Sequence, residues 1–172
     1  MHTLVLGGIR SGKTALAERL ASNTANSSVV YLATATANDD EMRARIQRHQ
    51  QQRPADWGLE EEALALGQVL ARYAQTQSAP CLLVDCMSLW LSNLLHAGEE
   101  TFACEREAFL QHVSRYPGEL VIVSNEVGLG TIGMDPLTRR FADELGWLNQ
   151  SLATVSDKVV MSVAGLSMVL KP

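Results

Sequence analysis

The sequence predicts an α/β fold in which helices flank a mainly parallel β-sheet. Two observations support this prediction: apolar runs of strand length recur along the chain, and segments of helix length separate them. The runs are too continuously apolar for a sheet with one face in water, whereas parallel strands are buried on both faces and joined by crossovers. The expected strands are residues 3–6, 29–33, 81–84, 120–124 and 158–163.

The expected helices are residues 13–22, 41–52, 64–74, 100–114 and 136–153. The last of these has a clear start, because Asp135 can cap the helix and Pro136 suits its first turn. Thr36 with Asp39 forms a variant of the capping box ahead of the helix from residue 41.

The end of the chain predicts a short hairpin, since a turn at residues 164–165 is followed by the apolar run 166–170. The chain has 172 residues, of which 47% are apolar, and no interdomain linker or repeat interrupts it. This length and composition predict a single domain over residues 1–172.

Charge and hydropathy exclude two classes of partner. The net charge of -5 argues against a nucleic-acid surface, which needs clustered Lys and Arg. No apolar run approaches the roughly 18 residues of a membrane span, so we expect a cytoplasmic protein. Cys81, Cys86 and Cys104 are odd in number and lack paired zinc-ligand spacing, so we expect reduced thiols.

A glycine-rich loop joins the first expected strand to the first expected helix. Glycines let successive backbone N–H groups face phosphate oxygens, and the helix adds its positive end. Lys13 is expected to reach the β- and γ-phosphates, and Thr14 to bind Mg²⁺. The motif and its context predict a P-loop NTPase-type (RecA-like) fold that uses a nucleoside triphosphate. The loop consists of Gly7, Gly8, Ile9, Arg10, Ser11, Gly12, Lys13 and Thr14.

A second candidate for the metal is Asp85, which ends the apolar run 82–84. In folds with a P-loop, an acidic residue at the end of another strand holds the Mg²⁺ ion. An apolar strand that ends in Asp is common in soluble proteins, so this assignment depends on the P-loop.

His49 is the candidate nucleophile. It follows Met42 and Ile46 on one face of the expected helix 41–52, and arginines lie nearby in sequence. A cationic neighbourhood attracts a triphosphate and keeps the imidazole neutral, which suits attack on phosphorus. The alternative is a solvated basic helix that ends in a turn at Pro54, and the residues alone leave both interpretations open.

Short segments along nearly the whole chain match one known family. They are the P-loop and residues 31–35, 40–42, 45–46, 49, 53–57, 85–86, 91–95 and 124–128. With them, the chain resembles the bifunctional adenosylcobinamide kinase and adenosylcobinamide-phosphate guanylyltransferase family of cobalamin assembly. The P-loop alone is widely shared, whereas its ordered combination with His49 and Asn125-Glu126-Val127-Gly128 is far more specific.

The resemblance implies two reactions. ATP or GTP would phosphorylate the hydroxyl on the aminopropanol arm of adenosylcobinamide, and GMP from GTP would then be transferred to that phosphate. In the family a histidine carries GMP covalently, and His49 matches it. Covalent catalysis splits a difficult transfer into two easier displacements.

The resemblance also implies further nucleotide-binding positions. Arg53 would pair with phosphate and Glu61 would accept hydrogen bonds from a guanine edge. For Glu61 the alternative is a solvated carboxylate in an acidic run. Gln50 and Ala63 depart from the family pattern, where a basic residue and a proline are expected. The implied positions are Ala33, Thr34, Ala35, Gln50, Gln51, Gln52, Arg53, Glu61 and Asp85.

Residues 125–130 follow an expected strand end, where α/β sheets place ligand contacts. They form either a substrate-binding loop or an ordinary connection, and the role of Glu126 stays open. The resemblance implies a homotrimer, with Trp57 as one possible subunit contact. Two alternative functions are a kinase without the second reaction and a nucleotide-operated switch.

Overall fold

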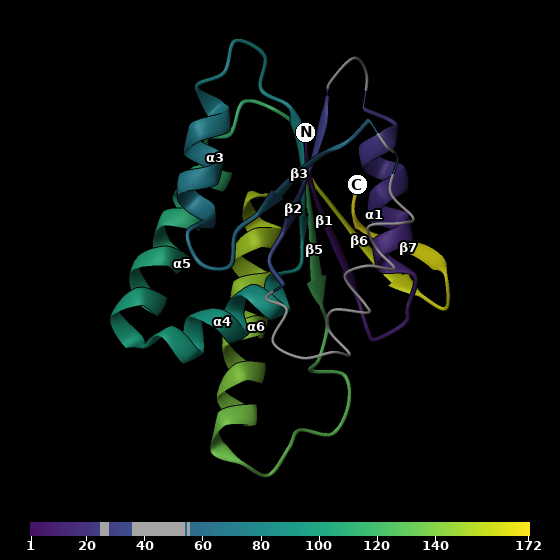
Figure 1. Cartoon of the computed structure of the whole chain (residues 1–172). Coiled ribbons are helices and arrows are strands. Elements are labelled where there is room, and N and C mark those ends of the chain that lie inside the picture. Colours follow the sequence, from purple (N-terminus) through teal and green to yellow (C-terminus); the bar gives the residue numbers. More distant parts are fainter. Residues whose placement is uncertain (25–27, 36–53, 55) are drawn as a thin grey trace.

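The computed structural model describes residues 1–24, 28–35, 54 and 56–172 (Figure 1). Its strands are β1 (His2–Gly7), β2 (Val29–Ala33), β3 (Gly58–Glu61), β4 (Cys81–Asp85), β5 (Leu120–Asn125), β6 (Lys158–Val163) and β7 (Leu166–Lys171). Its helices are α1 (Lys13–Ser22), α3 (Leu66–Ala74), α4 (Met87–Ala97), α5 (Glu99–Val113) and α6 (Pro136–Val155).

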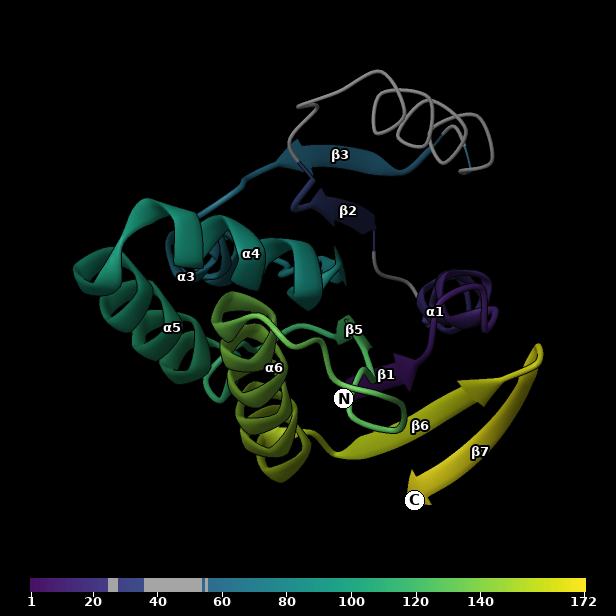
Figure 2. The ribbon, with the colours of Figure 1, turned by 90° about the horizontal axis from the view of Figure 1, so that it is seen from below.

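The strands form one seven-stranded sheet in the order β3-β2-β4-β5-β1-β6-β7. All neighbouring pairs are parallel except β6 with β7, which form the predicted C-terminal hairpin. Figure 2 shows α3, α4, α5 and α6 on one face of the sheet and α1 on the other. The predicted mainly parallel α/β architecture is therefore confirmed.

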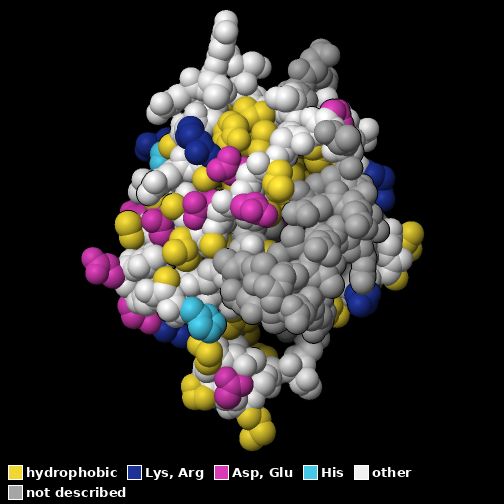
Figure 3. Space-filling model, in the orientation of Figure 1, with side chains coloured by type: hydrophobic (Ala, Val, Ile, Leu, Met, Phe, Trp, Pro, Cys, Tyr) yellow, Lys and Arg dark blue, Asp and Glu magenta, His cyan; other side chains and the backbone are white. Residues whose placement is uncertain are grey.

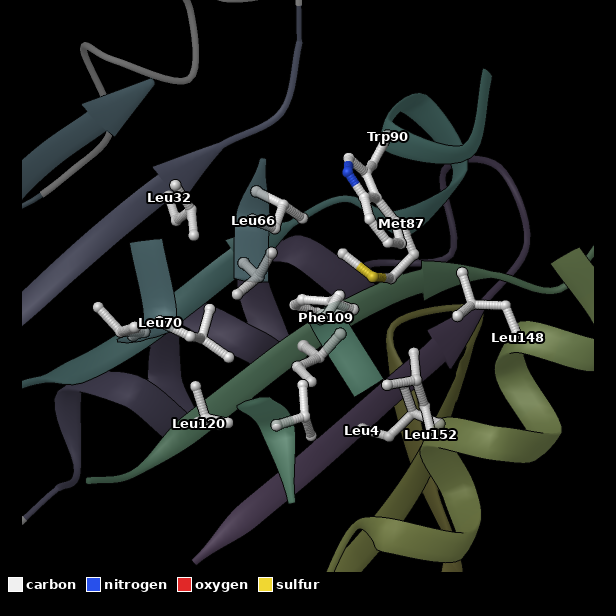
Figure 4. Close-up of a cluster of buried hydrophobic side chains, with 14 of the residues drawn as sticks. Leu4, Leu32, Leu66, Leu70, Met87, Trp90, Phe109, Leu120, Leu148 and Leu152 are labelled. Carbon is white, nitrogen blue, oxygen red and sulfur yellow. The ribbon is translucent and has the colours of Figure 1, made fainter. Parts of the chain in front are cut away.

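Both faces of the central strands are buried, as the continuous apolar runs indicate. Leu4 faces a cluster with residues of α3, α4, α5 and α6, whereas its neighbour Val5 packs on the α1 side. In the larger cluster, the ring centroids of Trp90 and Phe109 lie 4.8 Å apart (Figure 4). Each leucine fully buried there contributes about 2 kcal/mol of transfer free energy, so the clusters fix the helices on the sheet.

The predicted start of α6 is confirmed, because Asp135 accepts a hydrogen bond from the backbone N–H of Thr138 at 2.8 Å. The helix expected from residue 64 begins instead at Leu66. The side chain of Glu62 accepts hydrogen bonds from the backbone N–H groups of Leu64 and Ala65, which holds these residues in a turn. The expected helix 41–52 and the capping pair Thr36 and Asp39 lie outside the described residues.

Two elements were not predicted. Helix α4 lacks a side-chain cap, and its few polar residues are scattered among apolar ones in sequence, so it has no clear start signal. Strand β3 is short and acidic, and it forms by pairing with β2. Part of the acidic run 60–62 is therefore ordered: Glu60 forms an ion pair with Arg72 at 2.7 Å.

Within the described part of the chain, no helix has both the length and the apolar character needed to cross a membrane.

Candidate functional site

The glycine-rich loop connects β1 to α1 at the carboxyl edge of the parallel strands. Gly12 has a φ of 91°, in the left-handed region that favours glycine, and Arg10 has a φ of 53°. Gly7 is confined by packing, because an added Cβ would lie 2.4 Å from the Ser11 Oγ and 2.8 Å from the Ser162 carbonyl oxygen. The loop conformation thus requires glycine at both ends of the motif.

Lys13 stands at the first turn of α1, and its Nζ donates a hydrogen bond to the Gly8 carbonyl at 3.1 Å. The side chain is thereby folded back over the loop. A cation held there, beside the positive end of a helix, suits the binding of phosphate oxygens.

Asp85 and Thr14 meet at this edge although they are 71 positions apart. The Thr14 hydroxyl lies 3.3 Å from the Asp85 Oδ2, and the Tyr31 hydroxyl donates to the same oxygen at 2.8 Å. Asp85 ends β4, and Thr14 follows the loop at the end of β1. Because β1 and β4 run in the same direction in one sheet, their carboxyl ends lie at the same edge, and the two side chains meet there. A hydroxyl and a carboxylate next to a phosphate loop offer the oxygen ligands that Mg²⁺ prefers.

The segment 33–35 lies beside this carboxylate, because Ala33 pairs with Asp85 in the sheet. Thr34 is fully buried, and its hydroxyl both donates to the Cys86 carbonyl and accepts from the Cys86 N–H, each at 2.8 Å. Thr34 therefore anchors the backbone that carries Asp85.

Cys86 itself is a buried thiol. Burial, followed by the nearby charge of Asp85, raises its pKa, so the neutral form is favoured. Of the other two cysteines, Cys81 is buried, Cys104 is exposed, and all three are free, as predicted.

Of the other predicted positions, the structure describes Glu61 but not the segment that contains His49. Glu61 is exposed at the end of β3, where it pairs with Ala33, so it lies near the edge that carries the P-loop. His49 and the segment Gln50, Gln51, Gln52 and Arg53 lie outside the described residues.

The structure adds contacts to the P-loop that the sequence did not suggest. The Ser11 carbonyl accepts two hydrogen bonds, from the Ser162 hydroxyl and from the Gly165 N–H, each at 2.8 Å. Both donors belong to the β6–β7 hairpin. Their sequence separation from the loop exceeds 150 residues, so no local pattern could have revealed them.

Residues after β5 reach the same edge. Gly7 pairs with Asn125, and the Glu126 N–H donates to the Gly7 carbonyl at 3.1 Å. Asn149 of α6 donates to the Asn125 carbonyl at 3.0 Å and accepts from the Ser124 hydroxyl at 2.6 Å. The buried Asn149, which had no predicted role, thus holds the end of β5.

Curated proteins similar to this chain share its full length. The chain is 47% identical over 172 residues to the bifunctional adenosylcobalamin biosynthesis protein CobP of Pseudomonas aeruginosa, covering 99% of this chain and 98% of that protein. It is 36% identical over 185 residues to the bifunctional adenosylcobalamin biosynthesis protein CobU of Salmonella typhimurium, covering 99% and 100%.

Solved structures with a similar fold are far more distant in sequence. They include a Pyrococcus horikoshii protein (TM-score 0.56, 13% identity, 99% of this chain and 85% of that one). They also include the type III secretion ATPase EscN of enteropathogenic E. coli (TM-score 0.57, 9% identity, 95% and 43%). These likenesses bear on the fold alone, and they confirm the predicted P-loop NTPase type.

The family model CobU, described as cobinamide kinase / cobinamide phosphate guanyltransferase, matches residues 3–170. Together with the full-length relatives, this match confirms the resemblance found in the sequence. The chain therefore belongs to the cobinamide kinase / cobinamide phosphate guanyltransferase family, whose members are bifunctional transferases.

Proposed function

We propose that this protein phosphorylates adenosylcobinamide with ATP or GTP and then transfers GMP from GTP to the new phosphate. The observation that carries the proposal is the convergence of the P-loop with Asp85, through Thr14, in a chain of this family. The product of both steps would be adenosyl-GDP-cobinamide.

In the first step, the substrate hydroxyl attacks the γ-phosphorus and the nucleoside diphosphate leaves. The P-loop N–H groups and Lys13 would bind the phosphates and stabilise the charge that develops on them. The described residues fit a Mg²⁺ ion, which Thr14 and Asp85 would hold. When bound, such an ion neutralises phosphate charge.

In the second step, a neutral His49 nitrogen attacks the α-phosphorus of GTP and pyrophosphate leaves. An oxygen of the substrate phosphate then attacks the phosphorus of the GMP-histidine, and the P–N bond breaks. Ala33, Thr34, Ala35, Glu61 and the segment 50–53 would bind the nucleotide. This step is supported by the family match and by the histidine at position 49.

The decisive experiment is intact-protein mass spectrometry after incubation with Mg²⁺ and GTP. We expect an acid-labile mass gain of one GMP in the wild type and in His112→Ala, a matched control on α5, but not in His49→Ala. A folded wild type that binds GTP without this gain would contradict the histidine intermediate and favour the kinase alone.

We further propose that the chain is one domain, acts in the cytoplasm and assembles as a homotrimer. The family resemblance supports the trimer, and light scattering at several protein concentrations tests it.

A further inference from the structure

A pocket lies beside the P-loop edge and has no part in the nucleotide site described above. Its volume is about 390 Å³. Nine residues line it: Ser88, Leu89, Ser92, Leu95 and His96 from α4, Asn125 from β5, and Leu137, Thr138 and Phe141 from α6. The lining combines apolar walls with hydrogen-bonding side chains and contains no Asp, Glu, Lys or Arg, as in sites that bind small uncharged molecules.

The position of the pocket relates it to phosphoryl transfer. Asn125, at the end of β5, is one of its lining residues, and β5 lies between β4, which carries Asp85, and β1, which leads into the P-loop. A group bound at the end of β5 is therefore flanked by both phosphate-binding elements. A larger pocket of about 500 Å³ involves Met1 and Glu119, at the opposite edge of the sheet, and so faces away from the P-loop.

Asn125 can form a further hydrogen bond. The Asn125 Nδ2 donates to the Ser88 hydroxyl at 3.0 Å, and that hydroxyl also lies 3.1 Å from the Cys86 sulfur. Among the described residues, the buried Oδ1 of Asn125 has no hydrogen-bond partner. A buried polar atom without a partner costs free energy, so a ligand that supplies one is favoured there.

Asn125 and Leu137 line the pocket, and the chain between them exposes apolar side chains. Exposed hydrophobic side chains follow Asn125 along the chain: Leu129 is 78% exposed, Ile132 52%, Met134 94% and Leu137 54%. Figure 3 shows several separate hydrophobic side chains, with an acidic one among them, at the lower end of the molecule, where α6 begins in Figure 1. Several exposed apolar side chains within one short segment are available for contact with a ligand.

We propose that this pocket binds the hydroxyl-bearing arm of the corrinoid acceptor, with the Asn125 side chain hydrogen-bonded to it. The exposed side chains of residues 129–137 contact the bulk of the acceptor outside the pocket. The inference rests on the proposed function for the identity of the acceptor. It explains why the lining contains no Asp, Glu, Lys or Arg, since the arm offers an amide and a hydroxyl, whereas the triphosphate is bound by the P-loop.

The test measures the KM values for adenosylcobinamide and for the nucleotide in the Leu137→Gln and Leu170→Gln variants. The second is the matched control, because Leu170 is 52% exposed but lies on β7. For Leu137→Gln we expect the acceptor KM to rise about fivefold, from the lost apolar contact, with the nucleotide KM unchanged. For Asn125→Ala we expect kcat/KM for the acceptor to fall about tenfold. Leu170→Gln should match the wild type.

Equilibrium dialysis with adenosylcobinamide alone separates this inference from the proposed function. If the wild type bound adenosylcobinamide but did not phosphorylate it, and Leu137→Gln bound it more weakly, the proposed function would be contradicted and the pocket supported. If Leu137→Gln and Asn125→Ala both phosphorylated the acceptor with the KM and the affinity of the wild type, the proposed role of the pocket would be wrong and the proposed function would stand. A nucleotide KM that rises in step with the acceptor KM would also overturn it, because the substitution would then act on the P-loop.

Discussion

Two loops at one edge of the sheet, the P-loop and the segment 126–135, are held in different ways. The P-loop is tied to distant strands, since its Ser11 carbonyl accepts hydrogen bonds from Ser162 and Gly165 of the hairpin. The segment after β5 is tied to the P-loop at its start, through Glu126 and Gly7, and is otherwise organised by local contacts. Glu126 accepts from the Gly128 N–H, and Asp135 accepts from Thr138.

This difference between the two loops explains how one edge of the sheet can bind two ligands. A triphosphate needs backbone N–H groups in fixed positions, and a loop fastened by neighbouring strands provides them. A large acceptor needs an open surface, and a mostly exposed segment with its own turns leaves its apolar side chains available. Substitutions at Lys13, Asp85, Ser162 and Asp135 test this contrast.

Removing the cation of the P-loop should have the largest effect. In Lys13→Ala we expect the rate of phosphoryl transfer to fall at least about 100-fold, because the charge that develops on the phosphates loses its cation. The measurement is single-turnover phosphorylation with saturating ATP. Circular dichroism should show an unchanged fold, and a rate within a few-fold of the wild type would contradict the assignment.

The second prediction concerns Asp85. Asp85→Asn keeps the size of the side chain but removes its charge, so we expect about a tenfold or greater loss of activity. The Mg²⁺ concentration needed for half-maximal activity should also rise. Asp143→Asn, an exposed position on α6, is the control. If the Mg²⁺ dependence of Asp85→Asn matched that of the wild type, Asp85 would be structural only.

The third prediction breaks the tie between the hairpin and the P-loop. Ser162→Ala removes one hydrogen bond to the Ser11 carbonyl, worth about 1 kcal/mol, so we expect the nucleotide KM to rise about fivefold. The acceptor KM should not change. Ser167→Ala is the matched control, because Ser167 pairs with Ser162 across the hairpin but is exposed. Equal effects of the two variants would show that the hairpin does not position the loop.

The fourth and smallest effect concerns the other loop. The side-chain hydroxyl of Thr138, and then its backbone N–H, hold the pKa of Asp135 below its usual range. The ionised cap therefore stabilises α6 above the unfolded pKa of about 3.9, and this stabilisation is lost as the pH falls through the folded pKa. Asp135→Ala should lower the midpoint of thermal unfolding slightly at pH 7.

That difference should shrink toward zero as the pH falls through the lowered folded pKa of Asp135. Asp143→Ala supplies the control, because Asp143 lies within α6 rather than at its cap. A difference that persisted unchanged in acid would contradict a role for the ionised cap.

Much of the fold and part of the site could be predicted from the sequence alone. Apolar runs showed the strands of a buried sheet, and Asp135-Pro136 marked the start of α6, because these signals depend on neighbouring residues. The P-loop was recognised for the same reason: its glycines, Lys13 and Thr14 are consecutive. The order of motifs along the chain indicated the family, and the comparisons confirmed it.

Which distant groups meet could not be predicted from the sequence and follows from the packing of the folded chain. Strand β3 exists because β2 offers its edge, and α4, which has no side-chain cap, packs against β5, α5 and α6. The contacts from Tyr31 to Asp85 and from Ser162 to Ser11 join residues 54 and 151 positions apart. Such pairs follow from the order of strands in the sheet, which depends on the packing of the whole chain and leaves no local trace in the sequence.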